Sequence, residues 1–332
     1  MLEKKFTIKL STAGGGKPFL RQLPNLTPIW KDCEFYINED IPECDLWVVQ
    51  GGLGKVEQTK CPPDMTLFIT NEPPSVKKFS KKFTQQFDYV LTCPGTTKSG
   101  NTIYGQQALP WWVGHKVGST STTYDKTYDQ LTALQPTPKT KLLSIIASNK
   151  QFTKGHKLRY NFAQYIKKEL GDDVDVFGMG ENSVEDKWDA IAPYKYHIVI
   201  ENGSYDHYWS EKLADSFLAQ SYPLYYGAPN IHEYFTKDML TAIDITDPKK
   251  ALQTIKEVIA NDTYEKSVTD LAQAKDLILN TYQLFPMLYT YLHEHLQNEA
   301  KTLITLAPER QSGIVPYMKK CVKALLRIIH AR

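Results

Sequence analysis

The amino-acid sequence has 332 residues, of which 42% are hydrophobic and 23% charged. This composition is typical of a folded globular protein and excludes a disordered chain, and the length allows one large domain or two of ordinary size. Lysine and arginine together number 39, against 37 aspartates and glutamates, so the net charge of +2 gives no reason to expect a nucleic-acid partner.

Short apolar segments alternate with helical patterns along most of the chain. Several of these segments are rich in β-branched residues, and they predict strands at 6–10, 46–50, 67–70, 89–92, 142–147, 174–177, 198–201 and 224–226. Apolar residues spaced three and four apart predict helices at 76–87, 158–170 and 252–259. Such alternation of strands and helices indicates an α/β fold in which parallel sheets are covered by helices.

The best candidate for a linker is QPTPKT at 135–140, which contains two prolines and no apolar periodicity. It predicts an N-terminal α/β domain at 1–136, a C-terminal α/β domain at 141–310 and a tail at 311–332. We expect the two domains to be Rossmann-like and to face each other across a cleft, because open α/β sheets bind ligands beyond the carboxyl ends of their strands.

The tail ends in a predicted basic amphipathic helix, YMKKCVKALLRIIHAR at 317–332. Val322, Leu325, Leu326 and Ile329 share one face, and lysines and arginines occupy most of the rest. Two interpretations remain open: the helix makes a peripheral contact with an anionic membrane surface, or it packs on the body of the protein with its basic face in water.

Cysteine spacing and apolar content bear on the cellular compartment. The cysteines show no Cys-x-x-Cys or other metal-type spacing, so we interpret all five as free thiols: Cys33, Cys44, Cys61, Cys93 and Cys321. The first residues, MLEKKFTIKLSTAGGG, contain no apolar stretch of signal-peptide length, and no run of about 18 apolar residues follows. We therefore expect a cytoplasmic protein, located at the inner face of the membrane if the tail binds there.

The segment 194–235 carries the most chemical information. Within it, Ser210 is a good N-cap for a helix whose first turn would contain Glu211 and Lys212. The free N–H groups and partial positive charge of a first helical turn suit a diphosphate, and Lys212 would add a full charge. Tyr208 can pack on a ribose or a base, and Glu211 can accept hydrogen bonds from sugar hydroxyls. Taken alone, the same residues also fit an ordinary solvated helix start.

Six ordered features in this segment resemble the C-terminal signature of the fucosyltransferases of glycosyltransferase family 10. They are Tyr194-Lys195-Tyr196, Glu201-Asn202, Tyr208-x-x-Glu211-Lys212, a helix, Ala219-x-x-x-Pro223 and Gly227-Ala228-Pro229. The resemblance continues upstream through Ile146-Ala147-Ser148-Asn149 and the following Arg159, and it covers about 141–235. It is weaker in the N-terminal half, where it includes the stretch FITNEPP at 68–74.

The resemblance implies a GT-B type fold and an inverting transfer of fucose from GDP-fucose to a hydroxyl of a galactose- or N-acetylglucosamine-type glycan, in surface polysaccharide or glycoconjugate synthesis. It implies a general base at Glu72, although exchange of this role with Glu201 remains open. It implies donor-binding roles for Ser148, Asn149, Arg159, Lys187, Glu201, Asn202, Tyr208, Glu211 and Lys212. Because a nucleoside diphosphate leaves readily once cations neutralise it, we expect neither a metal nor another cofactor.

Two adjacent tryptophans are candidates for acceptor binding. Trp111 and Trp112 follow a Leu-Pro pair, and either they stack on acceptor sugar rings or they belong to the core. Ile200, Ser210 and Tyr226 depart from the residues that are usual in the family. An alternative is therefore a transferase of the same fold that uses another nucleotide sugar, and a second is a non-catalytic carbohydrate-binding relative.

Overall fold

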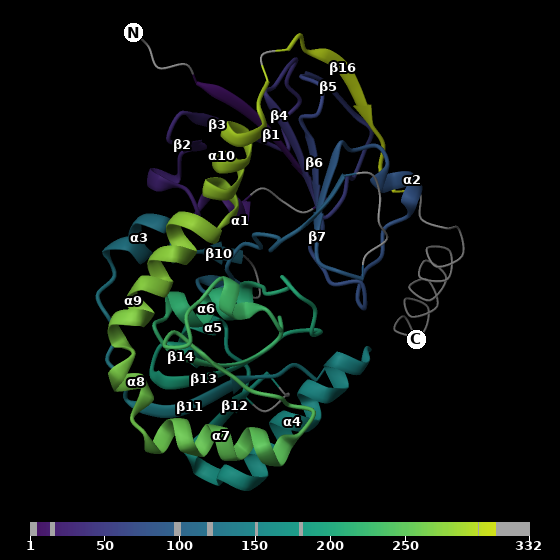
Figure 1. The fold of residues 1–332 in the computed structure, drawn as a ribbon. Coiled ribbons are helices and arrows are strands. Elements are labelled where there is room, and N and C mark those ends of the chain that lie inside the picture. The colour runs from purple at the N-terminus through teal and green to yellow at the C-terminus, as the bar shows by residue number, and fades with distance from the viewer. Residues whose placement is uncertain are drawn as a thin grey trace, which may run out of the picture.

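The computed structural model describes residues 5–13, 17–95, 101–117, 122–149, 152–178, 182–297 and 299–309. These residues form two α/β lobes, each built on its own parallel sheet with its own hydrophobic core (Figure 1). Four of the five cysteines lie in the described part, and all four are buried free thiols, as expected. No helix within these residues is both long enough and apolar enough to cross a membrane.

The N-terminal sheet has the strand order β2-β3-β1-β4-β6-β7-β8. Its strands are β1 (Phe6–Thr12), β2 (Ile29–Trp30), β3 (Cys33–Ile37), β4 (Leu46–Gln50), β6 (Thr66–Ile69), β7 (Tyr89–Thr92) and β8 (Asn101–Tyr104). All neighbours are parallel except β2 and β3, which form a hairpin. Every residue of β4 and β6 is buried, which explains why these strands read as continuous apolar runs.

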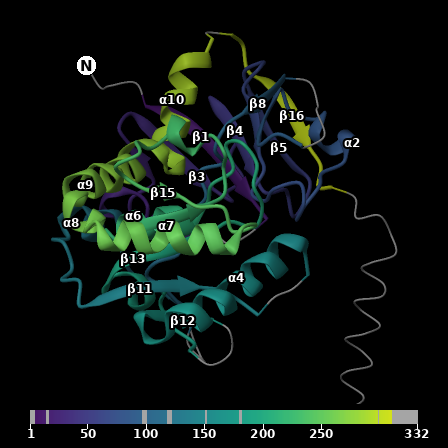
Figure 2. The same cartoon turned by 60° about the horizontal axis from the view of Figure 1, so that its bottom comes forward.

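The C-terminal sheet has the strand order β12-β11-β13-β14-β15, and all of its neighbours are parallel. The strands are β11 (Lys141–Ile146), β12 (Val174–Phe177), β13 (Tyr194–Ile200), β14 (Tyr222–Tyr226) and β15 (Thr241–Ala242). Helices α4 (Lys154–Leu170) and α7 (Pro248–Ala260) cover one face, whereas α5 (Lys187–Ile191) and α6 (Glu211–Leu218) cover the other (Figures 1 and 2). The carboxyl ends of all five strands therefore meet at one edge.

One predicted helix is much shorter in the structure. The apolar spacing predicted a helix over 76–87, but only α2 (Lys81–Thr84) is helical. The apolar residues still share one environment, because Phe79, Phe83 and Phe87 all contact the ring of Phe68, with ring centroids 4.7, 5.1 and 5.1 Å away. Burial around one aromatic ring thus produced the spacing that we interpreted as a long helix.

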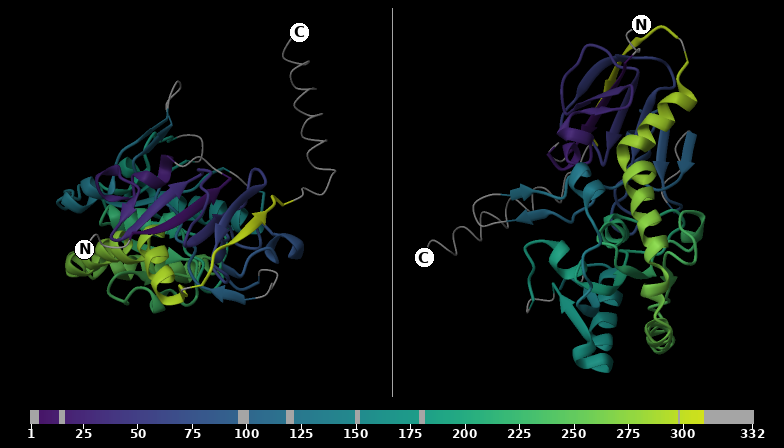
Figure 3. Two further views of the ribbon diagram at one scale, coloured as in Figure 1. Left: turned by 90° about the horizontal axis from the view of Figure 1, so that it is seen from above. Right: turned by 90° about the vertical axis from the view of Figure 1, so that its left-hand side faces the viewer.

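The chain crosses between the lobes twice, and the predicted domain limits do not anticipate either crossing. Trp111, Val113 and Leu131 pack in the C-terminal core, although they precede the predicted linker. After α8 (Thr263–Lys266), helix α9 (Val268–Leu277) leads through a π-helical segment at 278–282 to α10 (Leu284–His295), which packs in the N-terminal core (Figure 3).

Strand β16 (Thr302–Leu306) completes the return by pairing with β5 (Glu57–Cys61) of the N-terminal lobe. The prediction that 141–310 form one domain is therefore wrong for its last part. A helical pattern of apolar residues does not say which core buries it. The predicted tail at 311–332, with its amphipathic helix, lies outside the described residues.

The inner face of α10 should contribute strongly to stability. Phe285 is fully buried and meets Phe35 edge-to-face, with ring centroids 4.8 Å apart. We predict that Phe285→Ala lowers the free energy of unfolding, measured by urea denaturation, by about 3–5 kcal/mol because it leaves a cavity. Leu303→Ala, on a side chain of β16 that is 65% exposed, should change it by less than about 0.5 kcal/mol. Equal effects of the two substitutions would contradict the packing of α10 against this core.

A buried histidine in the C-terminal sheet should make stability depend on pH. His197 on β13 pairs with Ser144 on β11, and its Nδ1 lies 2.8 Å from the Ser144 Oγ. Burial, assisted by the nearby charge of Lys187, lowers the pKa of His197 to about 3. In the unfolded chain this histidine binds a proton below about pH 6.5, whereas in the folded chain it stays neutral until about pH 3. Its contribution to the free energy of unfolding is therefore fully present above about pH 6.5 and is lost as the pH falls toward 3.

We predict that His197→Gln removes this loss, which amounts to about 1.4 kcal/mol per pH unit for one proton. Urea unfolding at several pH values between 6.5 and 4.5 measures the slope, which should be shallower in the variant than in the parent chain. The matched control is His232→Gln, because His232 is exposed. Identical slopes in the parent chain and His197→Gln would rule out a buried neutral imidazole at this position.

Candidate active site

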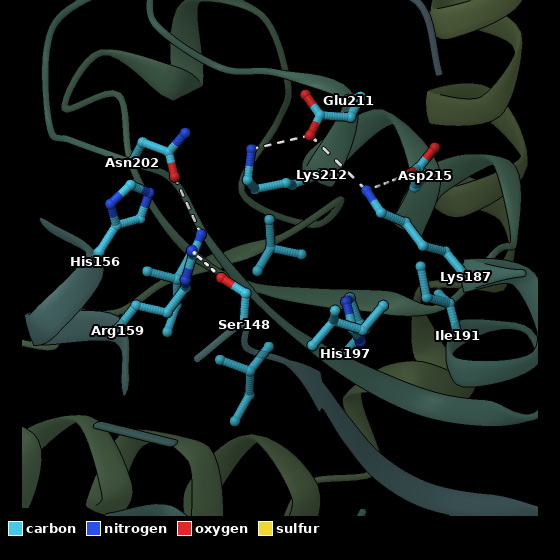
Figure 4. Close-up of a pocket in the computed structure, with 14 residues that line it drawn as sticks. Ser148, His156, Arg159, Lys187, Ile191, His197, Asn202, Glu211, Lys212 and Asp215 are labelled. Atoms are coloured by element: carbon cyan, nitrogen blue, oxygen red, sulfur yellow. Dashed lines mark hydrogen bonds and ion pairs between the residues drawn. The ribbon is translucent and has the colours of Figure 1, made fainter. Parts of the chain in front are cut away.

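The polar residues that follow β11 and β13 meet at the carboxyl edge of the C-terminal sheet. Arg159 of α4 lies between them, donating from Nη1 to the Asn202 Oδ1 at 3.1 Å and from Nη2 to the Ser148 Oγ at 3.2 Å (Figure 4). Burial lowers the pKa of this guanidinium, and the negative charge of Glu201 is the main influence that raises it. Its Nε is buried and has no hydrogen-bond partner among the described residues. Arg159 is therefore held in place by two hydrogen bonds, while its Nε–H has no partner among the described residues.

Glu201, the first residue after β13, organises the start of α6. It is 1% exposed and accepts hydrogen bonds from the backbone N and the Oγ of Ser210, at 2.8 and 2.6 Å. Ser210 is the N-cap of α6, as predicted, and its side chain accepts from the Lys212 backbone N. Burial raises the pKa of Glu201, and Lys212, whose Nζ lies 3.5 Å from its carboxylate, opposes that rise.

Charges alternate along the first turns of α6 (Figure 4). The Oε1 of Glu211 lies 3.0 Å from the Nζ of Lys212 and 3.8 Å from that of Lys187, and Lys187 lies 3.2 Å from the Oδ2 of Asp215. Burial alone would raise the pKa of Glu211, but Lys212 and Lys187 lower it to about 2. Burial would likewise lower the pKa of Lys212, yet Glu211 and Glu201 raise it above its ordinary value. Both groups are therefore charged at neutral pH.

Asp215 also fixes a loop that enters the cleft. Its Oδ1 accepts hydrogen bonds from the backbone N of Trp112 at 2.7 Å and of Val113 at 3.0 Å. The Oδ1 of Asp186, just before α5, accepts from the next residue, Gly114, at 2.7 Å. Sequence reasoning missed Asp215, although its position four residues after Glu211 places both on one helical face. Its partner loop lies about a hundred residues earlier, which no local pattern reveals.

Two adjoining pockets contain most of the predicted site. One, of about 290 Å³, lies at the edge of the C-terminal sheet; Ser148, Arg159, Lys187, Asn202, Glu211 and Lys212 line it, together with His156 and His197, which sequence reasoning missed. The other, of about 710 Å³, is lined by residues of both lobes, including Gln50, Glu72, Trp112, Tyr208 and Lys212. The lobes therefore face each other across a cleft at this point, and Lys187, Asn202, Glu211 and Lys212 line both pockets.

Glu72 reaches this cleft from the N-terminal lobe. Its carboxylate is partly buried, and its Oε2 is buried without a hydrogen-bond partner within the described parts of the chain. Burial raises the pKa of Glu72; Lys212 opposes this rise and Glu211 reinforces it. A carboxylate whose pKa is raised and that keeps one oxygen without a partner in the described chain, opposite a row of cations, is suited to accept a proton.

The remaining predicted site residues differ in how far their side chains are exposed. Tyr208 is 1% exposed and lines the interlobe pocket. Trp112 is 37% exposed and lines it as well. Trp111 is 1% exposed in the C-terminal core, and its Nε1 donates to the Lys126 carbonyl, so of the two interpretations the core applies to Trp111 and acceptor stacking does not. Asn149 is exposed and lines neither pocket.

Comparison with known proteins agrees with this architecture. Residues 136–268 match the family model for the C-terminal part of glycosyltransferase family 10 (fucosyltransferase). A segment of 105 residues is 31% identical to GDP-fucose protein O-fucosyltransferase 3 of Danio rerio, and this match spans 28% of this chain but only 23% of that protein. A crystal structure of an alpha1,3-fucosyltransferase with GDP aligns with 85% of this chain and 94% of its own, at 13% identity and a TM-score of 0.50.

The structural alignment includes both lobes, and it confirms the expected fold of two Rossmann-like domains in the GT-B arrangement. The family match contains every donor-side residue that the resemblance indicated, from Ser148 to Lys212. Its limits also enclose β11 to β15 with α4 to α7, which together form the sheet and helices that hold these residues. Over residues 136–268, the chain therefore resembles the C-terminal part of glycosyltransferase family 10.

Proposed function

We propose that this glycosyltransferase moves fucose from GDP-fucose to an acceptor hydroxyl and inverts the configuration at the anomeric carbon. The observation that carries the proposal is the arrangement of opposite charges across the cleft, where Glu72 of one lobe faces the cations of the other in a shared pocket. The named relatives support the donor, since one is a GDP-fucose O-fucosyltransferase and another is an alpha1,3-fucosyltransferase that was crystallised with GDP.

In this proposal the diphosphate lies at the N-terminus of α6 and along the smaller pocket. Arg159, Lys187 and Lys212 line that pocket, and the Nε of Arg159 provides a donor that no described residue uses. The first turn of α6 adds its free N–H groups. Cations held in place before the reaction stabilise the charge that develops on the departing diphosphate at little cost in rearrangement.

The transfer needs one proton acceptor. Glu72 takes the proton of the acceptor hydroxyl while the oxygen of that hydroxyl bonds to the anomeric carbon. The bond from the anomeric carbon to the diphosphate breaks at the same time, and its electron pair leaves with GDP. Attack from the side opposite the leaving group inverts the anomeric carbon. Glu201 fits this task less well, because its carboxylate already accepts two hydrogen bonds from Ser210 and lies 3.5 Å from Lys212.

The acceptor would occupy the interlobe pocket. Trp112 presents an exposed ring there and can stack on the apolar face of a sugar. We propose a galactose- or N-acetylglucosamine-containing glycan as the acceptor, in polysaccharide or glycoconjugate synthesis. The Danio rerio relative is a protein O-fucosyltransferase, so hydroxyls of peptides are the second candidate.

A matrix of donors and acceptors tests the proposed function. The chain is incubated with GDP-fucose and with other nucleotide sugars, each combined with galactose-containing glycans, N-acetylglucosamine-containing glycans and serine- or threonine-containing peptides. Product masses should show addition of one deoxyhexose from GDP-fucose only, and NMR of the product gives the anomeric configuration. Transfer from a different donor alone, or no transfer from any donor, would contradict the proposal.

Lys212→Ala should weaken donor binding. The substitution removes a partly buried cation and leaves the negative charges of Glu211 and Glu201 without it, so they repel the diphosphate more strongly. The Kd for GDP measured by calorimetry should therefore rise at least tenfold, which is about 1.4 kcal/mol. Lys212→Arg keeps the charge and should retain part of the affinity. Lys195→Ala is the matched control, because Lys195 pairs with Glu265 at the surface of the same lobe. If GDP binds Lys212→Ala and the parent chain equally well, the diphosphate is not held here.

Glu72→Gln should separate catalysis from donor binding. The amide has the shape of the carboxylate but cannot take a proton, so kcat should fall by about 10²–10⁴-fold while the Kd for GDP stays within about twofold of the parent value. Because burial raises the pKa of Glu72, kcat of the parent chain should decline on the acid side at a higher pH than an ordinary carboxylate would give. That decline should be absent from the residual activity of the variant. A variant with parental kcat would assign the base elsewhere.

A further inference from the structure

Three side chains outside the cleft bring metal-binding atoms together. The carboxylate of Asp32, the thiol of Cys33 and the imidazole of His293 lie within 4.8 Å of one another. Asp32 and Cys33 lie at the hairpin between β2 and β3, and His293 lies in the last turn of α10, where that helix passes beside the N-terminal sheet (Figure 3). None of the three lines either pocket of the candidate active site.

The hairpin holds its two residues in fixed positions. Trp30 pairs with Cys33, so the turn contains only Lys31 and Asp32, and Lys31 has a left-handed backbone with φ of 53°. The Asp32 carbonyl accepts a hydrogen bond from the Phe6 backbone N at 2.8 Å, which ties the turn to β1. The Cys33 Sγ lies 3.7 Å from the Asp32 Oδ1, so the two side chains point to the same place.

The hydrogen bonds of His293 decide which of its nitrogens can bind a metal. The Nδ1 lies 2.9 Å from the Tyr289 carbonyl oxygen, which can only accept, so Nδ1 carries the hydrogen. The Nε2 of the neutral ring then presents a lone pair, and it lies 3.1 Å from the Asp32 Oδ2, another acceptor. Two acceptors that face each other repel unless a cation or a proton lies between them. A histidine that donates one N–H to a carbonyl and offers its other nitrogen is typical of metal ligands.

We propose that Asp32, Cys33 and His293 bind one divalent metal ion of the zinc class. In a tetrahedral zinc site, bonds of about 2.0 Å to nitrogen and oxygen and about 2.3 Å to sulfur place the ligand atoms about 3.3–3.7 Å apart. The Asp32 Oδ2 lies 3.1 Å from the His293 Nε2, and its Oδ1 lies 3.7 Å from the Cys33 Sγ. With one atom from each residue the three ligands lie within 4.8 Å of one another, so small side-chain movements bring them to that spacing. The thiolate and imidazole select zinc over calcium or magnesium.

Solvent can reach this metal site and complete the coordination. The Asp32 and His293 side chains are 28% and 34% exposed, so water can supply the fourth ligand. On binding, the Cys33 thiol loses its proton to solvent and its sulfur bonds to the metal. The ion would join α10, which returns from the C-terminal lobe, to the hairpin of the N-terminal sheet. Its position outside the cleft gives it a structural role, separate from the transfer reaction.

Cobalt substitution tests the site directly. The full chain is stripped of metal with a chelator under reducing conditions and is then titrated with Co²⁺. We expect one equivalent to produce a thiolate-to-cobalt charge-transfer band and tetrahedral visible absorption, and one equivalent of Zn²⁺ to abolish both and to raise the Tm. Absence of the band from the parent chain would overturn the proposal.

Ligand variants identify the residues. Cys33→Ser should lose the charge-transfer band, and Asp32→Ala and His293→Gln should each weaken Co²⁺ binding by at least about 10–100-fold, the loss seen when only an outer partner of a ligand is removed. His295→Gln is the matched control, because His295 makes the same bond to the carbonyl four residues earlier, at 2.9 Å from Tyr291, and should bind Co²⁺ as the parent does. Circular dichroism confirms that each variant is folded. A band that persists in Cys33→Ser, or binding lost equally in His295→Gln, would contradict the assignment.

Discussion

The arrangement of the candidate site depends on one largely buried charge network at the start of α6. Glu201, Lys212, Glu211, Lys187 and Asp215 follow one another there with alternating sign. Buried charges are tolerated only when each has partners, and each member of this network has a neighbour of opposite sign. The cations that we assign to the diphosphate are therefore in place before any ligand binds.

The same network links the donor side to the cleft. Asp215 contacts Lys187 with one oxygen and holds the backbone of Trp112 and Val113 with the other. A residue proposed for the acceptor is thus anchored to the helix that is proposed to bind the donor. Glu72 comes from the other lobe, whose position depends on the two chain crossings and on the packing of α10 in the N-terminal core. Base and cations therefore share a pocket because long-range packing brings the lobes together.

Much of the fold could be predicted from the sequence because its signals are local. All eight predicted strands coincide with observed strands, and the N-cap role of Ser210 follows from residue type and position. The donor-side residues were indicated by a family resemblance rather than by pattern alone, since a serine, a glutamate and a lysine begin many helices. Arg159 is an example, because only the fold shows that it bridges the ends of β11 and β13.

The features that could not be predicted depend on contacts between distant segments. Trp111 and Trp112 are neighbours of one type, yet one ring is in the core and the other is in the cleft. The partners of Asp215 lie about a hundred residues away, and α10 packs in the core of the lobe that precedes it in sequence. Cys33 lies far from His293 in the chain, so cysteine spacing could only suggest a free thiol.

A crystal structure of the chain with GDP tests the central claim most directly. The account places the diphosphate between Arg159 and the first turn of α6, within hydrogen-bond distance of the Arg159 Nε and the Lys212 Nζ, with Glu72 across the open side of the pocket. A nucleotide seated elsewhere, with the charge network unchanged and its cations still paired only with carboxylates, would contradict it.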